Sequence, residues 1–363
     1  MLSKDLRKHA GQLSIAGFAG HNIPSDLKLL AREFDLGGII LFARNVDSPE
    51  QVAEIAREAQ SLAQELPLWV SVDQEGGRVA RLKTPFTVWP PMMTLGRSGD
   101  EKLAERFARA LAAELTAVGI SMDYTPVLDI LTNEKNPVIG DRALATTAEQ
   151  VARLGAMIIR TLQDKGIAAC GKHFPGHGDT SVDSHFELPL IEHPPDRIDR
   201  VELVPFRAAI EARVASIMTA HILIPALDND RPATLSKRVV TGILKEDLGY
   251  DGLVLSDDLE MKAISGRYGL SEATVMAIAA GCDAVLMCGE GQDKQADAIE
   301  AVIRAAESGE LSEKRLENAL ARHRRVKERF LVRRPKPLSG AALRAALGAE
   351  EHQAVSDEMA RFA

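Results

Sequence analysis

Short apolar runs alternate along this chain with longer segments of helical character, and this order is the strongest constraint on its fold. Apolar runs separated by helices are typical of βαβ units, which build parallel sheets. Eight such units favour an α/β protein with a closed (β/α)8 TIM-like barrel over an open doubly wound sheet. No G-x-G-x-x-G dinucleotide motif follows the first run, which agrees with this choice. We expect strands at Leu13–Gly17, Gly38–Phe42, Leu68–Asp73, Met122–Leu128, Ala168–His173, Ser216–His221, Leu253–Asp257 and Ala284–Cys288.

The segments between these runs carry helix signals. Ser48 stands directly before Pro49, as an N-cap stands before a proline at the first helical position. The segment Leu103–Ala117 is rich in Ala, Leu and Glu, and apolar residues recur every three or four positions over Thr147–Asp164. The helical period in these segments supports the crossover helices that a parallel barrel needs.

A break near the C-terminus suggests the domain organisation. The proline-containing segment Pro335-Lys336-Pro337 interrupts the helical pattern. Two alanine-rich helical pieces follow it. We therefore expect a barrel domain over residues 1–334 and a helical tail over residues 335–363 that packs on the outside of the barrel.

Charge and cysteine usage exclude several function classes. The formal net charge of −8 argues against a nucleic-acid-binding protein, because phosphate contacts need a basic face. The three cysteines lie in apolar runs and are odd in number, so we expect buried free thiols in a reducing compartment. No apolar run of about 18 residues is present, and the N-terminus lacks the apolar core of a signal peptide. We expect a cytoplasmic monomer without a membrane span.

Charged residues gather where the predicted strands end. In a (β/α)8 barrel the C-terminal ends of the strands carry the catalytic site. A set drawn from five strands is harder to explain by structural ion pairs than any single member is. The set comprises Asp73 after the third strand, Asp129 after the fourth, Lys172 and His173 at the end of the fifth, His221 after the sixth and Asp257 with Asp258 at the end of the seventh, with Arg142 in the loop after the fourth.

The segment Lys172–His185 contains one Lys, three His and two Asp beside two Gly and a Pro. A helix does not tolerate this composition and a central strand does not carry the proline, so we expect a loop. Asp183 and His185 are two residues apart, which suits a carboxylate that orients and charges an imidazole for acid/base work. Asp257 ends an apolar strand, where its carboxylate can be a nucleophile, a metal ligand or a general base.

At these residues the sequence resembles glycoside hydrolase family 3, and within it the single-domain bacterial β-N-acetylglucosaminidases of NagZ type. The matching blocks follow one another in family order over roughly residues 10 to 330. A match over several blocks is far more specific than a single motif. The blocks are Val72–Arg81, Val138–Arg142, Lys172–Thr180 with Asp183–His185, and Leu255–Met261.

The resemblance implies a TIM-like barrel that removes terminal β-linked N-acetylglucosamine with retention and without a metal or cofactor. Carried over position by position, it implies that Asp257 is the nucleophile and that His185 is the general acid/base. Asp183 is then the residue that orients and charges His185. The same comparison implies substrate-binding roles for Asp73, Arg81, Arg142, Lys172 and His173.

The resemblance also implies a substrate. Larger relatives carry a second domain that can supply the acid/base, whereas this chain is too short for one, so the proton donor should come from a loop of the barrel. The family and the expected compartment together point to a cytoplasmic muropeptide, N-acetylglucosamine β-1,4-linked to 1,6-anhydro-N-acetylmuramic acid. The expected process is peptidoglycan recycling.

Three other functions remain open from the sequence. A phosphorylase of the same family would also use a histidine acid/base, which does not repel incoming phosphate. A metal-dependent barrel hydrolase would use His173, His177, Asp183 and His185 as ligands, although the ammonium of Lys172 disfavours a cation there. A non-catalytic sugar-binding barrel would need to lack the nucleophile. For His177, Asp258 and Glu75 we expect structural roles.

Overall fold

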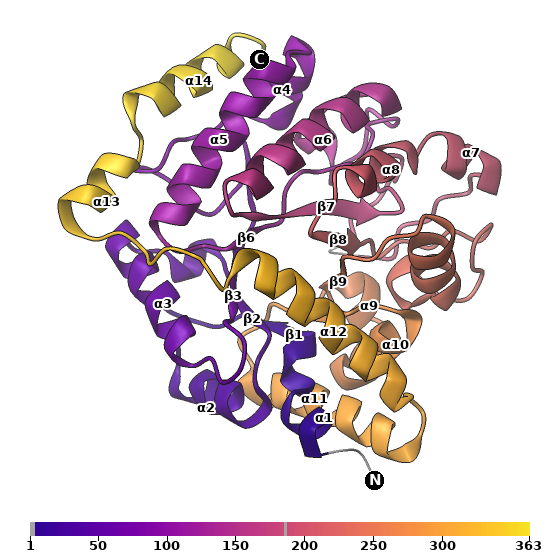
Figure 1. The fold of residues 1–363 in the computed structure, drawn as a ribbon. Helices are drawn as coiled ribbons and strands as arrows, with labels where there is room; N and C mark the ends of the chain where they lie inside the picture. The colour runs from indigo at the N-terminus through magenta and orange to yellow at the C-terminus, as the bar shows by residue number, and fades with distance from the viewer. Residues whose placement is uncertain (1–3, 185–186) are drawn as a thin grey trace.

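The computed structural model describes residues 4–184 and 187–363. Eight parallel strands form a closed barrel in the order β1-β10-β9-β8-β7-β6-β3-β2, with helices around it (Figure 1). The predicted (β/α)8 TIM-like barrel is confirmed. The strands are β1 (Ser14–Ala16), β2 (Gly38–Leu41), β3 (Trp69–Val72), β6 (Met122–Asp123), β7 (Ala168–Phe174), β8 (Ser216–Thr219), β9 (Leu253–Asp258) and β10 (Ala284–Met287).

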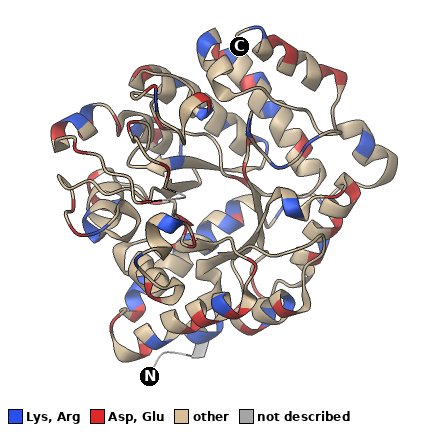
Figure 2. Cartoon of the chain, turned by 180° about the vertical axis from the view of Figure 1, so that it is seen from behind, with Lys and Arg blue, Asp and Glu red and all other residues tan. Residues whose placement is uncertain are grey.

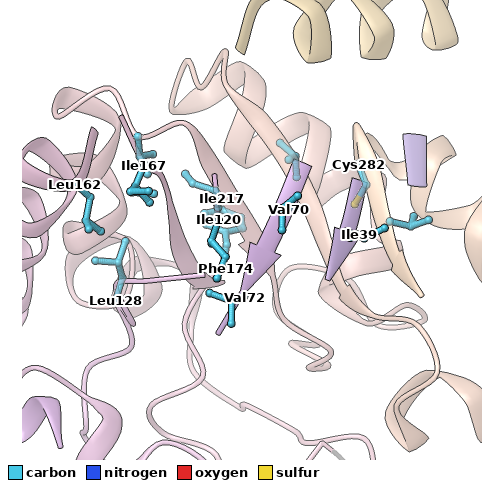
Figure 3. Close-up of a cluster of buried hydrophobic side chains, with 14 of the residues drawn as sticks. Ile39, Val70, Val72, Ile120, Leu128, Leu162, Ile167, Phe174, Ile217 and Cys282 are labelled. Carbon is cyan, nitrogen blue, oxygen red and sulfur yellow. The ribbon is translucent and has the colours of Figure 1, made fainter. Parts of the chain in front are cut away.

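The side chains of the strands alternate between two cores because the strand period is two residues. Val70 and Val72 of β3 point outward and belong, with Ile39 of β2 and Ile217 of β8, to the apolar cluster between strands and helices (Figure 3). Trp69 of the same strand faces the barrel interior, where it belongs to a separate apolar cluster. The apolar runs of the sequence are therefore buried on both faces, as parallel strands require.

The helices form the outer layer and one end of the barrel. Ser48 caps α3 as predicted, since its hydroxyl accepts a hydrogen bond from the backbone N–H of Gln51 at 3.3 Å. The helices are α1 (Lys4–Lys8), α2 (Ser25–Phe34), α3 (Pro49–Ser61), α4 (Met92–Ser98), α5 (Glu101–Ala117), α6 (Ala148–Asp164), α7 (Pro195–Arg200), α8 (Val204–Glu211), the π-type helix η5 (Arg238–Asp247), α9 (Lys262–Ser265), α10 (Leu270–Ala280), α11 (Gln292–Ser308), α12 (Glu313–Phe330), α13 (Gly340–Ala346) and α14 (Glu350–Ala360).

Helix α12 closes the N-terminal end of the barrel. It crosses in front of the strands in Figure 1. Val326, Phe330 and Leu331 belong to the same apolar cluster as the interior residues Trp69 and Leu253. The base of the barrel is therefore sealed by apolar contacts, and the C-terminal ends of the strands remain available for a site.

The chain after residue 335 forms the two helices α13 and α14. They lie beside α3, α4 and α5 (Figure 1). Leu343 and Met359 are fully buried there. The carboxylate of Glu114 on α5 accepts hydrogen bonds from the backbone N–H of Gly348 at 2.8 Å and from the ring of His352 at 3.0 Å. Apolar burial and one buried carboxylate thus hold the two helices to the barrel.

Two local features differ from the sequence analysis. The fourth strand was expected to extend from residue 122 to 128, but its regular pairing covers only Met122–Asp123, and after Pro126, which has no N–H, a single bridge pairs Val127 with Lys172. The short hairpin of β4 (Gln74–Gly76) and β5 (Val79–Ala80) was not predicted. Its turn contains Gly77 with φ 55°, a conformation that glycine adopts readily.

The surface carries both signs of charge. On the face seen in Figure 2, blue and red segments alternate along the outer helices. No helix within residues 4–184 and 187–363 has the length and apolar character that a membrane crossing requires.

Shortening Phe330 tests the closure of the barrel by α12. Truncation of a buried phenylalanine costs about 3–5 kcal/mol, so we expect Phe330→Ala to lower the free energy of unfolding by about that amount. Urea denaturation followed by circular dichroism measures this change. Val332→Ala is the control, because Val332 is 59% exposed, and its effect should stay below about 0.5 kcal/mol. Equal effects of the two variants would contradict a core role for α12.

His323 of α12 makes stability sensitive to acid. Burial, followed by repulsion from Lys327, lowers the pKa of His323 from 6.5 to about 3. The unfolded chain therefore takes up a proton below about pH 6.5 that the folded chain does not bind until about pH 3, so stability is complete above pH 6.5 and falls in acid. We expect His323→Leu to gain stability relative to the parent protein as the pH is lowered. Melting temperatures of both proteins between about pH 8 and pH 4 test this, and a constant difference would contradict it.

Candidate active site

A pocket of about 360 Å³ lies at the C-terminal mouth of the barrel. Its walls come from the ends of strands β2, β3, β7, β8, β9 and β10 and from the loops that follow them. Its apolar lining includes Met218 and Leu286, which face the barrel interior. Six residues predicted from the sequence line the pocket together: Asp73, Arg81, Arg142, Lys172, His173 and Asp257.

A buried ion network centred on Lys172 forms one wall. The Nζ atom of Lys172 lies 2.7 Å from Oδ1 of Asp73 and 2.6 Å from Oε1 of Glu75. Arg142 binds both carboxylate oxygens of Glu75, each at 2.8 Å. Glu75 and Lys172 are almost fully buried. Two cations therefore share one buried carboxylate, and Asp73 supplies a second.

The network decides the charge of its members. Burial disfavours the ionised form of Glu75, but the charges of Arg142 and Lys172 outweigh it and hold the pKa of Glu75 well below its usual range. Burial likewise opposes the charge of Lys172, and the carboxylates of Asp73 and Glu75 raise its pKa despite this. The wall is consequently a fixed set of charges at neutral pH, suited to charge-assisted hydrogen bonds to sugar hydroxyls.

The hairpin after β3 brings Arg81 back to the pocket. The side-chain carbonyl of Gln74 accepts hydrogen bonds from the backbone N–H groups of Arg81 and Leu82 at 2.8 and 2.9 Å. This turn places the Arg81 guanidinium 3.3 Å from Oδ2 of Asp73 and 5.3 Å from the centre of the Phe42 ring. Both oxygens of Asp73 therefore have a cationic partner, which fixes the orientation of its carboxylate.

Asp129 positions the two histidines of the β7 end. Its Oδ2 lies 2.7 Å from Nδ1 of His173, and its Oδ1 accepts the backbone N–H of His177 at 2.7 Å. Nδ1 of His177 lies 2.7 Å from the hydroxyl of Thr180. Burial lowers the pKa of His177 to about 4, so its ring is neutral at pH 7. His177 thus has the structural role expected, and His173 presents its other ring edge to the pocket.

Asp257 and Asp258 end β9 and differ in environment. Oδ1 of Asp257 accepts the backbone N–H of Asp258 at 2.8 Å. Burial works against the Asp257 carboxylate, but His221, His173 and this N–H lower its pKa below the ordinary value. Asp258 instead has a pKa raised to about 6, first by burial and then by the neighbouring Asp257 charge. Both carboxylates line the pocket, and Asp257 is the one with the lower pKa, so it stays ionised to more acidic pH than Asp258.

The structure describes one member of the predicted Asp183–His185 pair, Asp183. His185 lies outside the described residues. The backbone carbonyl of Asp183 accepts the N–H of Glu187 at 3.1 Å. Ser184 lines the pocket, and its carbonyl accepts the N–H of Ala263 at 3.1 Å. The chain that precedes His185 therefore runs along the pocket wall.

Sequence reasoning missed two residues that organise the site. Glu75 was expected to be structural and is so, but its part as the shared partner of Lys172 and Arg142 was not foreseen. Asp129 was noted at a strand end but given no role, although it holds both histidines. The only sequence feature that pointed to Glu75 and Asp129 was their position, because both follow strands at the mouth of the barrel.

Metal binding was an alternative use of these histidines. Nδ1 of His173 and Nδ1 of His177 are both engaged by protein oxygen atoms. Within the part of the chain that the structure describes, no group of three or more His, Cys, Asp or Glu side chains is arranged to hold a metal ion.

Replacing Glu75 tests the network. Glu75→Gln keeps the size of the side chain but leaves Lys172 and Arg142 without their shared counter-charge. Breaking a buried ion pair from one side costs about 3–5 kcal/mol, so we expect that loss in the free energy of unfolding from urea denaturation. Glu54→Gln is the control, since Glu54 pairs with Arg57 at the surface, and it should change stability by less than about 1 kcal/mol. A similar small effect for both variants would show that the network does not stabilise the fold.

With the geometry established, comparison with known proteins identifies the family. Residues 5–326 match the family described as Glycosyl hydrolase family 3 N terminal domain. Beta-hexosaminidase A of Pseudoalteromonas piscicida is 35% identical over 93% of this chain, and this chain spans 60% of that relative's length.

Solved structures similar to this chain support the same family. A glycoside hydrolase family 3 beta-N-acetylglucosaminidase from Paenibacillus sp. FPU-7 has a TM-score of 0.93 at 43% identity, over 98% of this chain and 68% of that one. NagZ from Neisseria gonorrhoeae in complex with N-trifluoroacetyl-D-glucosamine has a TM-score of 0.78 at 31% identity, over 96% of this chain and 97% of that one. The predicted resemblance is confirmed: this chain belongs to glycosyl hydrolase family 3 and is a glycosidase.

Proposed function

We propose that this protein is a retaining exo-β-N-acetylglucosaminidase that works through a covalent glycosyl-Asp257 intermediate. The observation that carries the proposal is the state of Asp257. Its carboxylate is ionised, lines the pocket and uses Oδ1 for the hydrogen bond from Asp258. Among the described residues, Oδ2 has no hydrogen-bond partner, so it is the oxygen available for attack.

The proposed reaction has two steps. Oδ2 of Asp257 attacks C1 of the sugar while protonated His185 gives its proton to the departing glycosidic oxygen. The neutral ring of His185 then takes a proton from water, which attacks C1 and releases the Asp257 carboxylate. Asp183 orients His185 and favours its charged form. The histidine replaces the carboxylic acid that most glycosidases use.

The charged wall holds the sugar for this reaction. Asp73, Arg81, Arg142, Lys172 and His173 are the proposed substrate-binding residues, and their mutual hydrogen bonds fix their positions before the sugar arrives. Fixed partners place C1 in line with Asp257 without further ordering cost. The barrel interior closes the pocket below Met218 and Leu286, which suits a terminal rather than an internal sugar.

The names of the relatives support the choice of sugar. The Pseudoalteromonas relative is named a hexosaminidase, and the Paenibacillus structure a beta-N-acetylglucosaminidase. The Neisseria NagZ structure holds an N-acylated glucosamine. We further propose that this protein acts as a cytoplasmic monomer on muropeptides that carry N-acetylglucosamine on 1,6-anhydro-N-acetylmuramic acid, in peptidoglycan recycling.

Removal of the nucleophile tests the mechanism. Asp257→Ala should lower kcat on an aryl β-N-acetylglucosaminide on the order of 10³-fold or more, as loss of a catalytic group does in other hydrolases. Added azide should restore turnover and give the α-glycosyl azide, because azide fills the space of the missing carboxylate and attacks from the same side. Product anomers are identified by proton NMR.

Asp258→Asn serves as the matched control, since it changes the adjacent carboxylate and leaves Asp257 in place. It should show no azide rescue. Retention of full activity by Asp257→Ala, or formation of β-glycosyl azide, would refute the covalent mechanism. Peptide mapping of the parent enzyme after treatment with a slow fluorosugar gives an independent result, and a label on any other residue would refute Asp257.

A further inference from the structure

His221 is a buried histidine at the end of β8 that the proposed mechanism does not use. The sequence placed it among the charged residues at strand ends, and it is 1% exposed. Its Nε2 lies 2.9 Å from the backbone carbonyl oxygen of Asp258. Its Nδ1 lies 2.9 Å from the hydroxyl of Thr234. Each ring nitrogen therefore has a protein partner, and the plane of the ring is fixed.

The direction of one of these hydrogen bonds follows from its acceptor. A carbonyl oxygen only accepts, so Nε2 of His221 carries a hydrogen and donates it to Asp258. The hydroxyl of Thr234 is itself held by the carbonyl of Ala220 at 2.9 Å and by the hydroxyl of Thr219 at 2.9 Å. The partner of Nδ1 is thus fixed to the same strand end. His221 therefore places an N–H donor of fixed position against the carbonyl oxygen of the residue that follows the nucleophile.

Asp258 makes hydrogen bonds to residues of several neighbouring segments. Its side-chain Oδ1 accepts the backbone N–H groups of Glu260 and Cys288, both at 3.1 Å. Its own N–H donates to Oδ1 of Asp257 at 2.8 Å. His221 adds the contact from β8 to its carbonyl. Strands β8, β9 and β10 therefore converge on the residue whose N–H determines the rotation of the Asp257 carboxylate.

We propose that His221 is a positioning residue which, by holding the carbonyl of Asp258, fixes the carboxylate of Asp257 so that Oδ2 is the attacking atom. The inference rests on the proposed role of Asp257 as nucleophile. A carboxylate held by one N–H on Oδ1 is free to rotate only if that N–H moves. Loss of the His221 contact lets the Asp258–Leu259 peptide tilt. This rotation passes through the Cα of Asp258 to its N–H, the donor to Asp257, and attack then starts from a less populated orientation.

Two variants of similar shape distinguish the effect of the His221 N–H donor from the effect of the volume of its ring. Gln places an amide N–H near the position of Nε2, whereas Met has similar length and no donor. Misplacement of a reacting group by about 1 Å costs on the order of 10²-fold in rate, so we expect His221→Met to lose about that factor in kcat. His221→Gln should recover at least about tenfold of it. KM and the affinity for free N-acetylglucosamine should stay within about twofold for both variants, because the substrate-binding wall is untouched.

Two controls keep the result specific. His352→Gln changes another buried, hydrogen-bonded histidine, which lies on α14 and contacts Glu114, and its kcat should equal that of the parent enzyme. Thr234→Val removes the hydroxyl that orients the His221 ring and should lower kcat by a smaller factor at unchanged KM. This second variant decides the question if His221→Met does not fold. Parent kcat in Thr234→Val would then overturn the proposal.

Other outcomes also overturn it. Equal kcat values for His221→Met and His221→Gln would mean that the donor is irrelevant. A rise in KM without a fall in kcat would place His221 in substrate binding instead. The rate of labelling by the slow fluorosugar separates this inference from the proposed function. A label on Asp257 that forms at the parent rate in His221→Met refutes the positioning role alone, whereas a label elsewhere in the parent enzyme refutes the nucleophile itself.

Discussion

The buried ion network around Lys172 is the constraint on which the mouth of the barrel depends. Charges removed from water are stable only when each has its partners, and removal of one partner is far more costly than the loss of a surface pair. Glu75 satisfies this condition for Lys172 and Arg142 at once. The loop after β3, the strand β7 and the loop after β6 must therefore meet in a single arrangement, which leaves the charged side chains of the pocket wall in fixed positions.

Apolar contacts close the N-terminal end of the barrel, and the charged pocket lies at the C-terminal end. The lower end is closed by Val326, Phe330 and Leu331 of α12, which pack against the apolar interior. The upper end carries charged side chains that would be costly to bury without one another. Because the apolar closure lies at the opposite end from the pocket, the charged mouth does not have to provide the main core. This division matches the general placement of catalytic residues in (β/α)8 barrels.

The sequence was sufficient for the architecture because periodicity is a local property. All eight strands lie where apolar runs predicted them, and the tail forms two helices. The fourth strand was predicted too long, since regular pairing stops at Asp123 and only an isolated bridge at Val127 follows within the expected range. Six predicted site residues line one pocket. The partners of Glu75 and the role of Asp129 could not be predicted, because these contacts join residues distant in the chain and residue type does not specify them.

The adjacent residues Asp257 and Asp258 show why environment decides the roles of identical side chains. Sequence alone offers two carboxylates at the same strand end, and the family resemblance was needed to choose between them. In the folded chain His221, His173 and a backbone N–H lower the pKa of Asp257, whereas burial raises the pKa of Asp258 to about 6. Separation of two neighbouring pKa values in this way assigns distinct tasks to one residue type. Asp257 keeps the lower pKa, and Asp258 donates its backbone N–H to that carboxylate while its own side chain accepts the N–H groups of Glu260 and Cys288.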